Sequence, residues 1–453
     1  MPETTRRSIL IAIPSLAALA ACGTDGADTA AEDSGTPTRD AEPATWDPDG
    51  STDEDGFPYG VQVGDVTADG ALVSVHSAEA TLSMVLVMGQ GDDWVEVDRQ
   101  EALPVTDGVL QLELTDLAAD SAFSVTFYAP DGDRRARATR FRTALADGDQ
   151  RVVTFGATSC LGGNEPWAIL SRAAEEKLDF FGLLGDTVYA DGSTSAEEFR
   201  RFWDAAMRIQ GMRDLSASTS LIATWDDHEV DNNWSRDDDN IDERLANATD
   251  LFNDFMPHRQ GGGDAGVWRK LSWGGTLDVF VLDCRSERVP AEGVYISRAQ
   301  MDWLKQGLSE STARFKIIFN SVPITAYFEI FNVIEQDDRW EGFPEAREEI
   351  IGHINDAGVK GVLWIAGDFH LTAVSRLDAA GGIGENQHEV LVGPGGSFFN
   401  PAGLLVKEPP EHFLTFFAEW NYTRFTADPG TGVIKVEYVD NNGQILDEID
   451  LSL

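Results

Sequence analysis

The sequence predicts an α/β region preceded by a small β-sandwich, and two changes of pattern along the chain indicate this. From residue 57 to about 144, short segments of alternating apolar and polar residues are separated by turns such as Asp107-Gly108, as in a β-sandwich. From Arg151 onward, apolar strand-like segments alternate with helix-like ones, as in an α/β domain. Apolar residues make up 42% of the 453 residues, enough for a sizeable core.

Each expected element follows from these patterns. In the first region, strands are expected at residues 71–76, 82–88, 108–114 and 124–128. In the second region, buried strands are expected at residues 152–157, 178–184, 221–225, 277–282, 315–319 and 359–366. Helices are expected between them at about residues 166–177, 195–209, 242–256, 298–308 and 344–357. The tail returns to hairpin strands around Asp440-Asn-Asn-Gly443, so we expect domains over residues 57–146 and 150–453.

Residues 1–22 are expected to form an export signal. Arg6-Arg7 precedes an apolar run, residues 9–21, that is too short to span a bilayer. The run ends in Leu19-Ala-Ala-Cys22, which resembles a bacterial lipoprotein signal in which the cysteine is lipidated. The arginine pair also resembles a twin-arginine signal, and a cleaved signal with a chance cysteine is the alternative.

Residues 23–56 contain eleven acidic residues and one arginine, with many Ala, Thr, Pro and Gly residues. This composition predicts a disordered, flexible tether. Together with the preceding signal, it predicts a periplasmic or cell-surface lipoprotein held on a bacterial membrane through Cys22.

The chain carries 34 basic and 78 acidic residues, a net charge of -44. Such a surface repels nucleic acid, so no nucleic-acid partner is expected. A solubility adaptation is the simplest explanation of this global charge. A site for an anionic phosphate ester would need local positive charge, and bound metal ions are the obvious source. The three cysteines exclude a disulfide scaffold, although a disulfide between Cys160 and Cys284 is an open alternative.

Polar residues able to bind metal follow one expected strand after another. These strand ends are Ser159-Cys160, Gly185-Asp186-Thr-Val-Tyr189, Asp226-Asp227-His228-Glu229, Asp283-Cys284-Arg285, Asn320 and Gly367-Asp368-Phe-His370. Ligands of α/β sheets bind outside the carboxyl ends of the strands. Buried carboxylates must share cations or hydrogen bonds there, so the series predicts a site for two or more metal ions.

The residue types narrow the choice of metal. Asp368 and His370 stand two apart, on one face of an extended segment. Carboxylates suit hard divalent cations, and imidazole suits iron, zinc or manganese. Cys160 and Tyr189 would favour a ferric ion if the fold brings them together. Each residue alone also has an ordinary structural reading: a turn for Gly-Asp, and packing for the cysteine or the tyrosine.

These motifs resemble those of the alkaline phosphatase D family of calcineurin-like metallophosphoesterases, over residues 57 to about 438. The resemblance is carried by the strand ends in their order, by Trp225-Asp-Asp-His-Glu-Val-Asp-Asn-Asn-Trp234 and by Gln300-Met-Asp-Trp-Leu304. It implies a four-layer α/β/β/α metallophosphoesterase sandwich preceded by a small fibronectin-like β-sandwich domain. It also implies iron and calcium as the metals, written Fe3+ and Ca2+.

The resemblance further assigns roles to residues. Cys160 and Tyr189 would hold ferric iron, Asp186 would bridge metals, and Asp368 and His370 would complete the cluster. In the segment after Trp225, the resemblance implies a further metal ligand, for which Asp227 and Asn232 are the two candidates.

Three residues are candidates for catalysis. His228 would stabilise the transferring phosphoryl group or protonate the leaving oxygen, and Arg285 would clamp the substrate. Asp226 is a third candidate for a catalytic role.

Three departures from the family pattern leave the substrate open. Leu161 stands where glutamine is frequent, and Cys284 stands where threonine is usual. The chain is also short for the family, so a more open site is expected, which would favour larger or lipid-linked substrates.

The expected function is an exported phosphoesterase, a monomer that hydrolyses phosphate esters by attack of a metal-bound water or hydroxide. A phosphodiesterase or phospholipase-like enzyme acting on lipid headgroups is one alternative. A non-catalytic binding lipoprotein, with structural metals, is the other.

The lipoprotein interpretation predicts that cells expressing the protein incorporate labelled palmitate into it, and that Cys22→Ala abolishes the label. Fluorography of the immunoprecipitated protein measures both. Incorporation into the Cys22→Ala variant, or none into the wild type, would contradict the interpretation.

Overall fold

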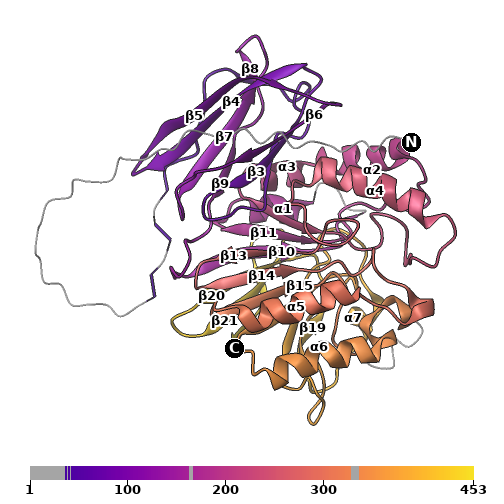
Figure 1. Ribbon diagram of the computed structural model, residues 1–453. Helices are drawn as coiled ribbons and strands as arrows, with labels where there is room; N and C mark the ends of the chain where they lie inside the picture. Colours follow the sequence, from indigo (N-terminus) through magenta and orange to yellow (C-terminus); the bar gives the residue numbers. More distant parts are fainter. Residues whose placement is uncertain (1–35, 38, 41, 163–166, 328–335) are drawn as a thin grey trace, which may run out of the picture.

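The computed structural model describes residues 36–37, 39–40, 42–162, 167–327 and 336–453. It consists of two stacked β-sheets with helices on their outer faces and a β-sandwich at one end (Figure 1). The expected signal, including Cys22, lies outside the described residues. Among the residues that are described, no helix is both long and apolar enough to cross a membrane.

The N-terminal region is a sandwich of two sheets. One sheet has the order β1 (Ser51–Thr52), β8 (Arg134–Arg135), β7 (Ala122–Tyr128), β4 (Thr81–Gln90) and β5 (Asp93–Pro104), with β9 (Thr139–Arg142) paired to β7. The facing strands are β2 (Val61–Gly64), β3 (Ala71–His76) and β6 (Val109–Leu114). Alternate apolar residues of both sheets, such as Val73, Met84 and Phe127, pack between them. The four strands expected here are confirmed.

Residues 42–56 were expected in the flexible tether, but the structure places them against this sandwich. Strand β1 pairs with β8, and the Ser51 N–H donates to the Asp133 carbonyl at 2.8 Å. The indole N–H of Trp94 donates to the Ala44 carbonyl at 2.6 Å. Strand pairing and hydrogen bonds to the sandwich therefore order a segment whose acidic composition predicts disorder.

The first large sheet joins this sandwich to the rest of the chain. Its order is β22 (Ile445–Ser452), β21 (Val433–Val439), β20 (Tyr422–Asp428), β10 (Val153–Thr158), β11 (Phe180–Leu184), β12 (Leu221–Thr224), then β2, β3 and β6. The join lies where Gly64 of β2 pairs with Leu221 of β12. The two regions divided at residues 146–150 in the sequence therefore share one continuous sheet.

The second large sheet has the order β13 (Arg269–Trp273), β14 (Leu277–Val281), β15 (Phe315–Phe319), β16 (Val362–Ala366), β18 (His388–Leu391), β17 (Thr372–Arg376) and β19 (Phe413–Phe417). Strands β14, β15, β16 and β18 are parallel, as are β10, β11 and β12 of the first sheet. The strands predicted from sequence are present in both sheets. Strands β13, β17, β18 and β19 were not predicted.

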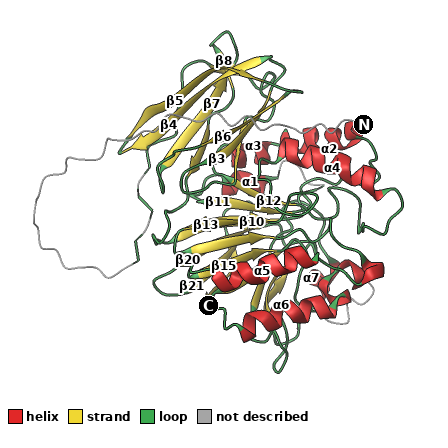
Figure 2. Cartoon of the chain, in the orientation of Figure 1, coloured by secondary structure: helices red, strands yellow, loops and turns green. Residues whose placement is uncertain are grey.

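Helices cover the outer face of each sheet (Figure 2). The first sheet packs against α1 (Ala168–Ala173), α2 (Ala196–Met207), α3 (Gln210–Ser216) and α4 (Ile241–Phe255). The second packs against α5 (Arg298–Glu310) and α6 (Pro344–Asp356), while α7 (Pro401–Leu405) is a short helix beside β19. Ser195 and Glu198 form a capping box that starts α2. These layers confirm the predicted α/β/β/α sandwich.

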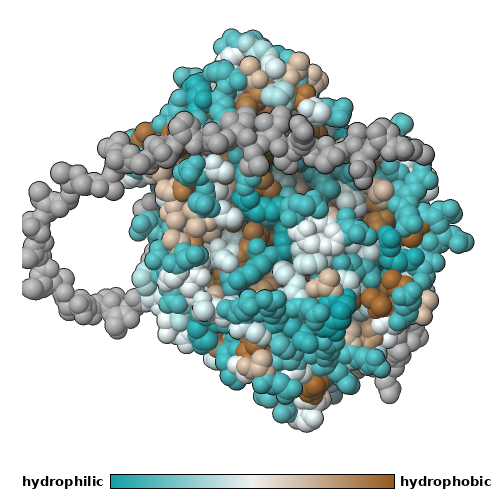
Figure 3. Space-filling model, in the orientation of Figure 1, coloured by the Kyte–Doolittle hydropathy of each residue, from teal (hydrophilic) through white to brown (hydrophobic). Residues whose placement is uncertain are grey.

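The strands are apolar on both faces because each sheet is covered on both sides. In β11, Phe181 faces the helices, whereas Phe180 faces the other sheet. Between the sheets, the ring of Phe155 lies 4.7 Å from both Phe180 and Phe425. The exterior differs sharply: the face in Figure 3 is mostly hydrophilic, with small separate hydrophobic patches. The charged residues that give the chain its net charge of -44 therefore surround an apolar interior on both faces of the sheets.

A buried ion pair fastens β2 to the second sheet. Asp65 directly follows β2 and has no exposed surface. Its carboxylate accepts hydrogen bonds from Arg269 of β13, from Nε at 2.6 Å and from Nη2 at 2.8 Å. It also accepts the backbone N–H of Arg259 at 2.6 Å.

We expect Asp65→Ala to lower the free energy of unfolding by about 3–5 kcal/mol, because the substitution leaves the Arg269 guanidinium buried without its charge partner. Urea denaturation followed by tryptophan fluorescence measures the change. Asp92→Ala, at an exposed hairpin position, is the matched control and should shift the value by less than about 0.5 kcal/mol. Equal stability of the two variants would contradict the proposed fastening role.

Candidate active site

The chemistry-bearing residues gather at the carboxyl ends of parallel strands from both sheets. Cys160 follows β10, Asp186 follows β11, and Asp226, Asp227 and His228 follow β12. Arg285 follows β14, and Asp368 and His370 follow β16. The site therefore forms where the edges of two stacked sheets meet.

Unusual backbone conformations turn several of these side chains into the site. Cys160, Asp186, Asp368 and His370 have positive φ angles of 55°, 55°, 67° and 52°. Non-glycine residues adopt this region at an energetic cost, and such strain concentrates at functional sites. Gly185 has a φ of 90°, and a Cβ there would lie 2.4 Å from the Cβ of Asp226. Glycine is thus required where the ends of β11 and β12 approach each other.

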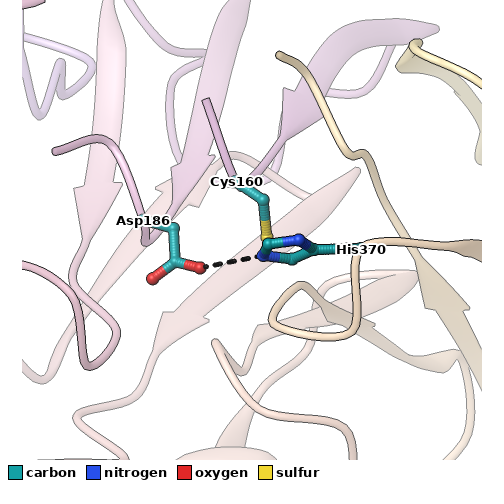
Figure 4. A group of neighbouring side chains, drawn as sticks. All are labelled: Cys160, Asp186 and His370. Carbon is teal, nitrogen blue, oxygen red and sulfur yellow. Dashed lines mark ion pairs between the residues drawn. The ribbon is translucent and has the colours of Figure 1, made fainter. Parts of the chain in front are cut away.

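The first group of candidate ligands is Cys160, Asp186 and His370, whose ligand atoms all lie within 4.8 Å of one another. Figure 4 shows the three side chains converging, with Asp186 Oδ2 3.7 Å from His370 Nε2. The Tyr189 hydroxyl lies 3.2 Å from the same Asp186 oxygen and 3.1 Å from His370 Nε2. The structure therefore brings Cys160 and Tyr189 to one site, as the ferric interpretation requires.

Two further groups continue from the first. Asp186, Asp227 and His228 form one, and Asp226, Asp227 and Asp368 form the other, again within 4.8 Å. Asp186 belongs to the first two groups and Asp227 to the last two. The two shared carboxylates connect the groups into a row in which neighbouring cations could be bridged.

The raised pKa values along the row of ligand groups are those expected where cations would bind. Burial raises the pKa of Asp226 to about 7 despite the neighbouring Arg285. Burial, with the charge of Asp226, raises the pKa of Asp368 well above its usual value, and burial and Asp186 do the same for the Cys160 thiol. Within the described residues, Oδ1 of Asp186 is buried without a hydrogen-bond partner. Carboxylate, imidazole, thiol and phenol donors crowded in this way fit bound metal ions, which would favour their deprotonated forms.

His228 is partly exposed, with 15% of its side chain accessible to solvent. Its ring stacks on Tyr189 at 4.1 Å, and Nδ1 lies 2.9 Å from both carboxylate oxygens of Asp191. Burial alone would lower the pKa of His228, but the hydrogen bond to Asp191 and the charge of Asp186 raise it to about 10. The Asp191 carboxylate therefore orients the imidazole through Nδ1 and favours its protonated form.

Arg285 occupies a different place from the substrate clamp expected of it. Its side chain is fully buried and makes two hydrogen bonds to Asp226, from Nε at 2.7 Å and from Nη2 at 3.0 Å. It also pairs with Asp338 and lies 3.7 Å from Asp368. Because its donors are engaged with carboxylates inside the protein, Arg285 balances the charge of the site, and Asp226 is its main partner.

The structure also bears on two alternatives that the sequence left open, the ligand near residue 230 and the pairing of the cysteines. The Asn232 side chain is exposed. Asp227 is buried, belongs to two of the three ligand groups and accepts the backbone N–H of Asn233 at 2.7 Å. This geometry favours Asp227 over Asn232 as the ligand. The alternative of a Cys160–Cys284 disulfide is wrong, since both cysteines are free, and the Cys284 thiol donates to Asn320 Oδ1 at 3.0 Å.

Glu229 has a structural role that the motif alone did not reveal. Its carboxylate accepts the backbone N–H groups of Asp186 at 3.1 Å, Thr187 at 2.6 Å and Asp226 at 2.9 Å. Burial and the charge of Asp186 raise the pKa of Glu229 to about 8. Glu229 thus ties the ends of β11 and β12 together and positions two candidate ligands.

Sequence reasoning also missed Asp191, Asp338 and Ser397. Asp191 stands two residues after Tyr189, so the Gly-Asp-x-x-Tyr motif could have pointed to it. Ser397 contacts the Tyr189 hydroxyl at 3.2 Å. Neither Ser397 nor Asp338 follows a recognisable motif, and only the fold brings them to the site.

The stacked sheets with an acidic site at their strand ends define a protein with the fold of the calcineurin-like phosphoesterases. The chain belongs to the PhoD-like phosphatase family, whose family model matches residues 155–397.

Individual relatives agree with this assignment. The chain is similar to alkaline phosphatase D of Bacillus subtilis (strain 168), with 25% identity over 280 residues, which is 50% of this chain and 47% of that protein. The match thus spans about half the length of that relative.

Two solved structures share the fold. The structure of PhoD has a TM-score of 0.74 at 19% identity, covering 88% of this chain and 89% of that one. Purple acid phosphatase PPD1 from yellow lupin (Lupinus luteus) seeds has a TM-score of 0.63 at 14% identity, covering 87% of this chain and 74% of that one.

The contacts of Glu229 predict that Glu229→Ala lowers hydrolytic activity by about 10–100-fold, because outer groups that orient metal ligands typically contribute this much. The variant should also retain less metal per chain, as measured by elemental analysis of the purified protein. Glu175→Ala, at an exposed position, is the control. Unchanged metal content and activity in Glu229→Ala would show that the tie is dispensable.

Proposed function

We propose that this phosphoesterase depends on metal ions and hydrolyses phosphate esters by direct attack of water. The observation that carries the proposal is the row of three ligand groups joined through Asp186 and Asp227. A non-catalytic protein would have little reason to bury so many carboxylates beside a cysteine, a tyrosine and two histidines, because each buried charge costs stability.

The donor types support iron and calcium as the ions. Cys160, Tyr189 and His370 suit ferric iron, and the carboxylates of Asp227 and Asp368 suit a hard cation such as calcium. When bound, such cations neutralise charge on the phosphoryl oxygens and make water a better nucleophile.

The residues of the chain perform the remaining tasks. His228, oriented by Asp191, would donate a proton from Nε2 to the oxygen of the leaving alcohol. The bond between phosphorus and that oxygen breaks as the bond to the attacking water oxygen forms, and the proton lost by that water passes to solvent, from which His228 is protonated again. Arg285 holds Asp226 in place and offsets the negative charge of the site. No phosphoenzyme is required.

The location is part of the proposal as well. The sequence of residues 1–22 supports export, and Cys22 supports a lipid anchor that holds the enzyme on a bacterial membrane. The substrate would then meet the enzyme outside the cytoplasm.

The proposed roles predict that Asp186→Ala and His370→Ala each lower kcat/KM at least about a hundredfold, the scale for removing one group that stabilises charge in the transition state. The assays are hydrolysis of 4-nitrophenyl phosphate and of bis(4-nitrophenyl) phosphate, which also separate a monoesterase from a diesterase. Far-UV circular dichroism checks the fold, and Asp302→Ala on the exposed face of α5 is the control. Near-native turnover by either site variant would refute the assignment, and a wild type inactive on both esters would favour the binding protein.

A further inference from the structure

Three exposed apolar side chains lie on one short segment of the chain. Phe398, Leu404 and Leu405 are 68%, 58% and 73% exposed, the three highest values among large hydrophobic residues in the described part of the chain. We call these three residues the apolar lip. All three lie within residues 398–405 of a chain of net charge -44, and exposed apolar surface of this kind marks binding sites.

The lip is fixed to the candidate site by hydrogen bonds. The Phe398 carbonyl accepts the Nδ1–H of His370 at 3.0 Å, and the Asn400 N–H donates to the His370 carbonyl at 2.9 Å. The Ser397 N–H donates to the Cys160 carbonyl at 2.9 Å. The Phe398 ring therefore stands at the edge of the first ligand group, 4.3 Å from the His370 ring.

The position of α7 keeps the two leucines outward. Gly403 faces the protein, since a Cβ there would lie 2.7 Å from the Cβ of Ala418 and 3.3 Å from that of Leu371. Leu371 directly follows His370. Leu404 and Leu405 are thus exposed on a helix that stays packed beside the site.

We propose that the apolar lip binds an alkyl or aryl substituent of the substrate, so that the preferred substrates are phosphate esters with an apolar group. The inference rests on the proposed phosphoesterase function. The acidic surface attracts no anionic ester from a distance, so recognition depends on contacts at the site itself. One end of such an ester meets the ligand groups, and the other can cover the exposed face of Phe398.

The test compares two esters of aliphatic alcohols, octyl phosphate below its micelle concentration and glycerol 3-phosphate, by release of inorganic phosphate. If the enzyme accepts only diesters, octyl and methyl 4-nitrophenyl phosphate replace them. We expect a higher kcat/KM for the octyl ester. Phe398→Ala should reduce the ratio of kcat/KM for the octyl ester to kcat/KM for the polar or methyl ester about tenfold. A loss of this size is expected when much of the apolar contact of a phenylalanine side chain is removed.

Phe398→Leu, which stays apolar, should retain most of the ratio. Ile445→Ala on β22, where Ile445 is 47% exposed, is the matched control and should leave both rates unchanged. A ratio near one in the wild type, or a ratio unaffected by Phe398→Ala, would overturn the inference while the phosphoesterase function stands. If Phe398→Ala instead reduces only cosedimentation with phosphatidylcholine vesicles, the lip contacts lipid and the substrate inference is wrong. A wild type that hydrolyses no ester refutes the proposed function itself.

Discussion

The structure depends on one electrostatic constraint, the burial of several carboxylates where strand ends meet. Asp186, Asp226, Asp227 and Asp368 lie close together, and like charges at such distances are unstable in a low-dielectric interior. Positive charge must compensate them. Arg285 supplies part of it from within the chain, and the row of ligand groups offers places where cations would supply the rest.

This constraint explains the surroundings of the site. The Glu229 carboxylate accepts three backbone N–H groups, and it thereby holds the turn after β11, where Asp186 has a positive φ, against the segment after β12. Asp191 holds His228, and Ser397 holds Tyr189. Outer residues of this kind fix ligand geometry, which is why many groups that touch no substrate are buried around the row.

The site also requires that the two large sheets keep their stacking. The aromatic contacts among Phe155, Phe180 and Phe425 fill the space between them. Through β2, the N-terminal sandwich extends the first sheet, and Asp65 binds that strand to the second sheet through Arg269. The N-terminal region therefore contributes to the frame of the site, although it places no residue in the ligand groups.

The sequence by itself predicted most of the strands and helices and pointed to the residues that form the candidate ligand groups. It did so because buried strands read as continuous apolar runs and their polar ends lie next to them in the chain. The tertiary structure decided which polar groups share a site, the internal pairing of Arg285, and the places of Asp338 and Phe398. These depend on contacts between residues far apart in sequence, and local pattern carries no information about such distances. The same limit applies to the sheet shared by the two regions, since the pairing of β2 with β12 joins segments more than a hundred residues apart.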